Sequence, residues 1–168
     1  IVRSNLGRKP VVVVSAVRKI TDRLIELAEL AKEGNGNEVF STIKNIHYGI
    51  LEELRLEKNL LDNDFNELQK AVKSVNGKMP DAKTMDLFQS FGERMSSKIV
   101  AAQLSKSGME AQAFNAFDLG LITTSDFGNA EPLDVSEEKM QAIKRSKEIV
   151  VTTGFIGKTL NGRITTLG

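Results

Sequence analysis

Apolar residues follow two kinds of pattern along this chain. Residues 11–16 and 149–153 are continuous runs rich in β-branched side chains, which predict strands buried on both faces, as in a parallel sheet. Between these runs, apolar residues recur at helical spacing over 21–31 and 38–75, and this spacing predicts amphipathic helices. We interpret residues 38–79 as a helical excursion that packs on one side of the sheet.

The remaining segments predict further elements around the same sheet. An amphipathic helix is expected to begin at Gly92-Glu93 and to continue toward Gly108. Asn161-Gly162, between two strand-like segments, is a signal for a type I′ hairpin. Further strands are expected at 111–117 and 119–123, and a further helix at 136–147. The order of elements predicts an α/β fold, a three-layer αβα sandwich with a mostly parallel sheet, which is incomplete in this chain.

Composition narrows the classes of function. The 168 residues carry 23 basic and 22 acidic side chains, a formal net charge of +1, which argues against nucleic-acid or anionic-membrane partners. No apolar stretch approaches the roughly 20 residues of a membrane span, and the first residues lack the regions of a signal peptide. The absence of cysteine excludes disulfides and thiolate metal sites. We therefore expect a cytoplasmic protein.

The candidate ligand site lies where the two apolar strands end. Ligands of open α/β sheets bind at the carboxyl ends of strands, where helix N-termini and loop amides converge. Ser15 ends the first strand and Thr21 begins the next helix, while Gly154 and Gly157 flank Phe155 after the last strand. Hydroxyls and glycine amides can donate hydrogen bonds to phosphate or carboxylate oxygens. Alternatively, Thr21 only caps its helix and Ser15 is only a turn residue.

The charged residues and the histidine allow either a structural or a functional interpretation. Glu93, on the expected first turn of its helix, either stabilises the helix dipole or pairs with a cationic group of a substrate. We interpret Arg94 and Lys98 as a solvated helix face rather than an anion clamp. His47, the only histidine, is interpreted as a surface or packed residue rather than a catalytic base. The sequence contains no P-loop, Rossmann glycine fingerprint or protein-kinase signature.

Four sequence blocks resemble, in the same order, motifs of the aspartate kinases, which belong to the amino-acid kinase family. They are VVVVSA with ITD at 11–22, SFGERMSS at 90–97, FGNAEP at 127–132, and GFIG with TTLG within 150–168. The resemblance implies transfer of the γ-phosphate of ATP, with Mg²⁺, to the β-carboxylate of L-aspartate. The product would be 4-phospho-L-aspartate, the first intermediate toward lysine, threonine and methionine.

The resemblance also implies roles for individual residues. Thr21 would hydrogen-bond the aspartate, Glu93 would bind its α-ammonium group, and Phe155 would close over it. The approach of ATP and its γ-phosphate would be lined by Ser15, Gly154 and Gly157. No metal ligand is predicted in this chain, and the complete enzyme is expected to be a homo-oligomer, a dimer.

Two family segments have no counterpart in this sequence. The KFGGTS segment, whose lysine neutralises phosphate charge, has no match before Val11, and the GRGGSD segment ends after its first glycine, Gly168. We therefore expect residues 1–168 to form the substrate-binding half of a catalytic domain, without a regulatory ACT domain and without kinase activity on its own. Two alternatives are an enzyme of the same fold acting on another small acidic metabolite, and a non-catalytic ligand-binding or assembly module.

Overall fold

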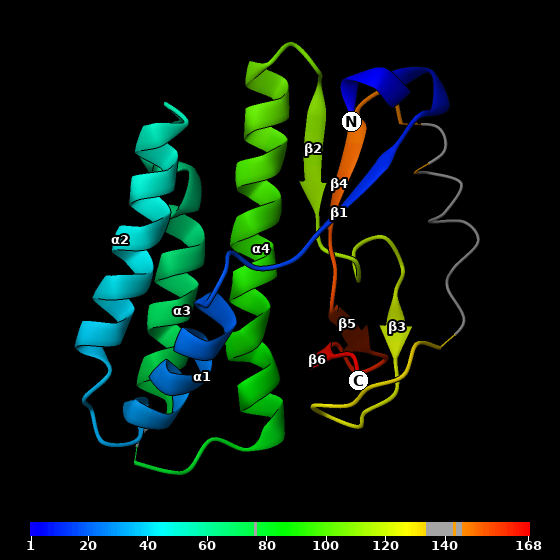
Figure 1. Ribbon diagram of the computed structural model, residues 1–168. Helices are drawn as coiled ribbons and strands as arrows, with labels where there is room; N and C mark the ends of the chain where they lie inside the picture. Colours follow the sequence, from blue (N-terminus) through cyan, green and yellow to red (C-terminus); the bar gives the residue numbers. More distant parts are fainter. Residues whose placement is uncertain (76, 134–142, 144–145) are drawn as a thin grey trace.

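The computed structural model describes residues 1–75, 77–133, 143 and 146–168, as an α/β arrangement of helices beside two small sheets (Figure 1). The helices are α1 (Ile20–Ala31), α2 (Asn37–Glu53), α3 (Asp62–Val75) and α4 (Ala82–Lys106), with the 3₁₀ turns η1 (Arg3–Arg8) and η2 (Lys58–Leu61). The strands are β1 (Val11–Val14), β2 (Ala111–Phe114), β3 (Ile122–Thr123), β4 (Ile149–Thr153), β5 (Ile156–Thr159) and β6 (Ile164–Thr166).

The strands form two sheets of three. The first has the order β1-β4-β2 and is parallel throughout, and the second has the order β3-β5-β6, with only the β5–β6 pair antiparallel. The predicted α/β fold with a mostly parallel sheet is therefore confirmed. In the described part of the chain, helices α1–α4 all lie on one side of the strands (Figure 1).

Burial differs between the two strands that were expected to be buried on both faces. Every residue of β4, the central strand, is buried, as predicted. The prediction is wrong for β1, in which Val11 is 48% and Val13 65% exposed. In the described structure β1 is an edge strand, and its side chains alternate between exposed and half-buried positions because only one of its faces is covered.

Four helices hold the main hydrophobic core. Large side chains from every helix are fully buried in it, including Leu24, Ile43, Leu68 and Phe88. Helices α2 and α3, the predicted excursion, pack on α1 and α4 (Figure 1), so that α4 lies between them and the strands. In the ranges that the structure describes, no helix is long and apolar enough to span a lipid bilayer.

Helix α4 differs from the prediction in its start. It begins at Ala82, where the Asp81 carboxylate accepts the Thr84 N–H at 2.8 Å, and it continues for 25 residues. Gly92 therefore lies in mid-helix, where it allows close packing: a Cβ there would be 2.7 Å from the Cβ of Ala16. Glu93 is not on a first turn, so the interpretation of this carboxylate as a helix-dipole charge is wrong.

Arg94 and Lys98 of α4 bind α3. The Asp64 carboxylate, whose side chain is fully buried, lies 2.6 Å from Lys98 Nζ and 3.7 Å from Arg94 Nη2. Arg94 also pairs with Glu67. The predicted solvated face is therefore wrong, because these side chains neutralise a buried carboxylate between two helices. His47 is a packed residue, as predicted: it is buried, and its Nδ1 lies 2.8 Å from the Ile43 carbonyl oxygen.

The predicted hairpin is present, but its turn is not type I′. Strands β5 and β6 pair with Lys158 opposite Ile164, and Gly162 donates its N–H to the Thr159 carbonyl oxygen. Only Gly162 has a positive φ in this turn, +77°, whereas a type I′ turn would also require one at Asn161. The strands expected at 111–117 and 119–123 are shorter than predicted, and the helix expected at 136–147 lies largely outside the described residues.

Candidate functional site

The carboxyl ends of β1 and β4 lie side by side. Val14 is the register partner of Thr153, and the next residue, Gly154, donates its N–H to the Val14 carbonyl oxygen at 2.8 Å. Ser15, exposed at the end of β1, therefore lies next to the turn that begins at Gly154. The two segments that the sequence predicted as ligand-binding come from opposite ends of the chain. They meet at the carboxyl ends of the parallel strands, and this is the edge of the sheet that carries the candidate site.

Glu93 reaches the same edge from α4. Its Oε1 accepts the backbone N–H of Ala16 at 3.2 Å, directly after Ser15. The residue is 3% exposed, and Oε2 is buried with no hydrogen-bond partner among the described residues. Burial raises the pKa of the Glu93 carboxyl above its ordinary value, and the Ala16 hydrogen bond opposes this only in part. A buried carboxylate with one free oxygen is suited to a cationic ligand, because such a ligand would supply the missing partner.

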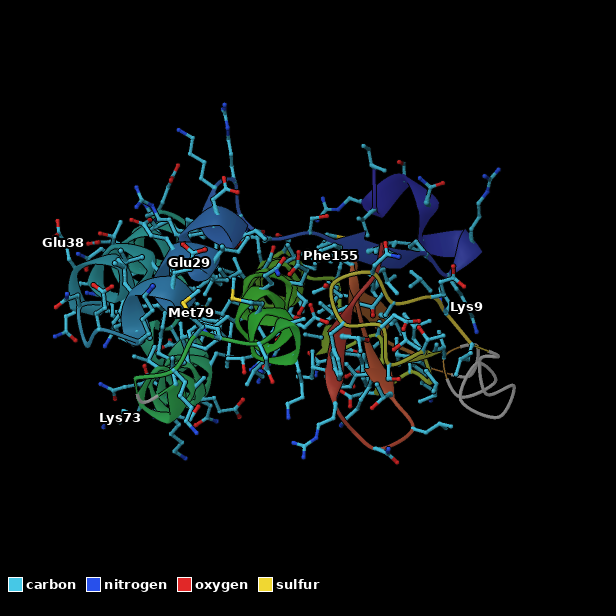
Figure 2. All side chains as sticks on the ribbon, turned by 90° about the horizontal axis from the view of Figure 1, so that it is seen from below. Lys9, Glu29, Glu38, Lys73, Met79 and Phe155 are labelled. Carbon is cyan, nitrogen blue, oxygen red and sulfur yellow. The ribbon has the colours of Figure 1, made fainter. Side chains whose placement is uncertain are left out.

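Phe155 directly follows Gly154 at the end of β4. It connects β4 to β5 with a φ of +58°, a left-handed conformation that is rare for an aromatic residue. Its carbonyl oxygen accepts the Leu167 N–H at 2.8 Å, and its side chain is 39% exposed. In Figure 2, Phe155 lies where the helical layer meets the strands. A strained backbone held by neighbouring strands together with an accessible ring is characteristic of a ligand-contacting turn.

Thr21 lies one residue inside α1. The N-cap position is Lys19, with a φ of +67° and no side-chain cap bond, so the interpretation of Thr21 as a helix cap is wrong. The preceding Ile20 is buried, and its side chain would lie 3.6 Å from a Cβ at Gly92. Thr21 itself is partly exposed in the first turn, where backbone N–H groups have no intrahelical acceptor.

The two glycines have structural roles that the sequence did not predict. The Gly154 N–H already bonds Val14, so this amide is not free for a phosphate oxygen, because the turn continues the parallel ladder. A Cβ at Gly154 would also meet Val13 and the Val14 carbonyl at 3.4 Å. Gly157 lies inside β5, where any Cβ would clash with the methyl group of Thr123. Both glycines allow close packing, and that Gly154 and Gly157 line the approach of ATP stays a prediction.

Asp86 is a residue that sequence reasoning missed. It is fully buried on α4, where Oδ2 accepts the Gly128 N–H and the Thr166 N–H, each at 3.0 Å. Its Oδ1 accepts the Thr166 hydroxyl at 2.7 Å. The available signal was its spacing, because Asp86 interrupts an apolar stretch two helical turns before Glu93 and so lies on the same face of α4.

The described residues do not form a site for a metal ion. No group of three or more His, Cys, Asp or Glu side chains in residues 1–75, 77–133, 143 and 146–168 is arranged to hold one. The groups that could bind an organic ligand at this edge are the carboxylate of Glu93 and the hydroxyls of Ser15 and Thr21.

Comparison with known proteins gives a consistent result. The sequence model of the amino acid kinase family matches residues 1–168. The chain is 34% identical over 172 residues to the chloroplastic aspartokinase 2 of Arabidopsis thaliana, covering 95% of the chain and 32% of that protein. It is 33% identical over 169 residues to the lysine-sensitive aspartokinase 3 of Escherichia coli K12, covering 94% of the chain and 36% of that protein.

The fold is also similar to a solved structure. The crystal structure of E. coli aspartokinase III in complex with aspartate and ADP, described as the R-state, matches with a TM-score of 0.83 and 28% identity. The match covers 99% of this chain and 39% of that chain. The chain thus spans about a third of the length of the relatives that it matches.

Proposed function

The chain belongs to the amino acid kinase family, and we propose that it forms the substrate-binding part of an enzyme that phosphorylates L-aspartate with ATP. An oxygen of the substrate's β-carboxylate would attack the γ-phosphorus, the bond to the β,γ-bridging oxygen would break, and ADP and 4-phospho-L-aspartate would result. The likeness to an aspartokinase bound to aspartate and ADP supports both ligands.

One observation carries the choice of substrate. The buried Oε2 of Glu93 has no hydrogen-bond partner within the described part of the chain, and it lies at the carboxyl end of the parallel sheet. An amino acid brings an ammonium group with three donors, and a charge-assisted hydrogen bond to a carboxylate is about twice as strong as a neutral one. Pairing with ammonium would also compensate the burial that raises the pKa of Glu93. We therefore assign Glu93 to the α-ammonium group.

The other residues at this edge suit the rest of the substrate. Thr21, in the first turn of α1, would hydrogen-bond a substrate carboxylate, and Ser15 would line the approach of the γ-phosphate. Phe155 would cover the bound amino acid and exclude water. Phosphoryl transfer depends mainly on positioning and charge neutralisation, so no histidine or cysteine nucleophile is needed among these residues.

Calorimetric titration of L-aspartate into the full-length protein, compared with its Glu93→Gln variant, tests the assignment. Glutamine keeps the shape of the side chain and its oxygen can still accept the Ala16 N–H, so only the charge is lost. Loss of a charge-assisted hydrogen bond, about 1.5 kcal/mol or more, should weaken binding at least about tenfold.

Two controls make the titration specific. Glu29→Gln on α1, a matched change at an exposed position, should bind L-aspartate as the wild type does. Succinate, which lacks the ammonium group, should bind the Glu93→Gln variant at least as well as it binds the wild type. Equal affinity of the wild type and Glu93→Gln for L-aspartate would refute the role of Glu93, and absence of binding to the wild type would refute the substrate.

A further inference from the structure

Asp86 joins three parts of the molecule at one carboxylate. It belongs to α4, it accepts the Gly128 N–H from the connection after β3, and it accepts both the N–H and the hydroxyl of Thr166 in β6. The side chain is fully buried, so these donors take the place of water around the charge. A buried carboxylate held by protein donors fixes the positions of the groups that donate to it.

The contacts of β6 continue from Asp86 to Phe155. Thr166 is the register partner of Ile156, the first residue of β5. The next residue, Leu167, donates its N–H to the carbonyl oxygen of Phe155 at 2.8 Å. Asp86 is therefore connected through Thr166 and Leu167 to the backbone of the turn whose aromatic ring is proposed to cover the substrate.

The same carboxylate fixes the helix that carries Glu93. Asp86 and Glu93 are seven residues apart on one face of α4, and each bonds a different strand end: Asp86 bonds β6, and Glu93 bonds the residue after Ser15. A slide or rotation of α4 relative to the β5–β6 hairpin would break the hydrogen bonds of Asp86. It would also change the separation between Glu93 and Phe155.

We propose that Asp86 is a positioning residue that sets the distance between the ammonium-binding carboxylate of Glu93 and the covering turn at Phe155. This inference rests on the proposed function for the roles of those two residues. Asp86 itself lies too deep to touch the substrate, because its oxygens are occupied by Gly128 and Thr166.

The geometry at Asp86 predicts which substitution preserves its role. In Asp86→Asn, the amide oxygen can accept both backbone N–H groups that now bond Oδ2. The amide nitrogen can donate to the Thr166 hydroxyl, which accepts as well as donates. Asparagine should therefore retain the connections, whereas Asp86→Ala removes the acceptor from all of the donors.

A first experiment needs no ligand. Amide hydrogen exchange is measured on the full-length wild-type protein and on Asp86→Ala, Asp86→Asn and Leu68→Ala, the last a cavity in α3 that lowers thermal stability at a distance from the site. The inference predicts exchange at least tenfold faster over 154–168 in Asp86→Ala than in Leu68→Ala under conditions of equal global stability. Asp86→Asn should restore slow exchange. Equal exchange of this segment in Asp86→Ala and Leu68→Ala would overturn the inference.

A second experiment measures binding of L-aspartate by calorimetry at a temperature at which every variant is folded. Asp86→Ala should lose at least tenfold in affinity, and Asp86→Asn should recover most of that loss. In a Phe155→Ala background the effect of Asp86→Ala should fall below threefold, because the turn that it positions no longer contributes its ring. An undiminished effect in that background would overturn the inference.

The two experiments separate this inference from the proposed function. If the wild type does not bind L-aspartate, the proposed function fails, while hydrogen exchange still decides whether Asp86 holds the β5–β6 hairpin. If L-aspartate binds and depends on Glu93 but hydrogen exchange over 154–168 does not respond to Asp86→Ala, only the positioning role fails.

Discussion

Helix α4 buries two carboxylates on one face, and the structure treats them in opposite ways. Asp86, near the start of the helix, is fully buried and is bonded at both oxygens by Gly128 and Thr166. Glu93, two turns later, is 3% exposed and has one bonded oxygen, while its Oε2 has no partner in the described ranges. The two groups share their chemistry and their burial and differ in whether the protein satisfies them.

Under the proposed function, this difference separates a structural carboxylate, Asp86, from a binding one, Glu93. A buried charge that is fully hydrogen-bonded within the protein has nothing left to offer a ligand, so it contributes to position and stability. A buried charge with a free oxygen is unfavourable until a donor arrives, and this makes it a binding site at some cost to stability. Substitutions at Asp86, and at or beside Glu93, test this difference.

The largest effect is expected from Asp86→Ala. Removing this acceptor leaves the N–H groups of Gly128 and Thr166 without their partner, and each unsatisfied buried donor costs about 1–3 kcal/mol. We expect the free energy of unfolding to fall by at least about 2 kcal/mol, measured by urea denaturation. A loss below about 1 kcal/mol would mean that water replaces the carboxylate and that Asp86 is not the satisfied member of the pair.

Smaller effects on stability, of opposite sign, are expected when two helical glycines are replaced by alanine. Gly92→Ala tests the contact, and Gly49→Ala is its matched control. A Cβ at Gly92 would lie 2.7 Å from that of Ala16, whose N–H is the donor to Glu93, so Gly92→Ala overpacks this contact. We expect a loss of about 1–3 kcal/mol in unfolding free energy. Gly49 in α2 is exposed, and a Cβ added there would meet no other group within 4 Å, so Gly49→Ala should gain about 0.5–1 kcal/mol.

Thermal denaturation of both glycine variants measures the contrast. If Gly92→Ala were as stable as the wild type, the close approach of α4 to Ala16 would not be needed to position Glu93. The affinity of Gly92→Ala for L-aspartate should also fall, because displacement of Ala16 moves the N–H group that orients the carboxylate. Gly49→Ala should bind L-aspartate as the wild type does.

The sequence predicted the position of the site better than the environment of its residues. The ends of the two apolar runs were expected to bind ligand, and they adjoin, with Val14 accepting the Gly154 N–H. The two ends adjoin because parallel strands bring their carboxyl ends together, whatever the intervening chain does, while ligand binding there stays a prediction. The long-range pairing of β1 with β4 needs only the apolar character of each run.

The sequence did not predict the start of α4, and the reason is physical. A glycine before Glu93 was taken as a helix start, but Gly92 is required in mid-helix for the close contact with Ala16, a contact between segments far apart in sequence. Asp86 was missed for the same reason, because its donors in Gly128 and Thr166 come from elsewhere in the chain. Local periodicity carries no information on such tertiary partners.

The smallest effect is expected in the pH dependence of stability, which tests whether the Glu93 carboxylate is unsatisfied in the folded protein. Burial raises the pKa of Glu93 in the folded protein, so the folded state keeps a proton over a range of pH in which the unfolded chain has lost it. Stability therefore falls as pH rises through this range and stays lower above it. Glu93→Gln removes the charge and keeps the hydrogen bond to Ala16, so it should be more stable than the wild type near pH 7.

The difference between Glu93→Gln and the wild type should shrink as the pH falls toward about 4, where the glutamate is mostly protonated in both states. Urea denaturation of both proteins between about pH 4 and pH 8 measures it, and the gain should be smaller than either effect above. Saturating L-aspartate should reverse the order at neutral pH, because ligand binding stabilises the protein that retains the ammonium partner more than the variant. If the wild type is instead more stable than Glu93→Gln near pH 7 without ligand, Glu93 is a satisfied carboxylate like Asp86. The contrast between the two carboxylates would then be refuted.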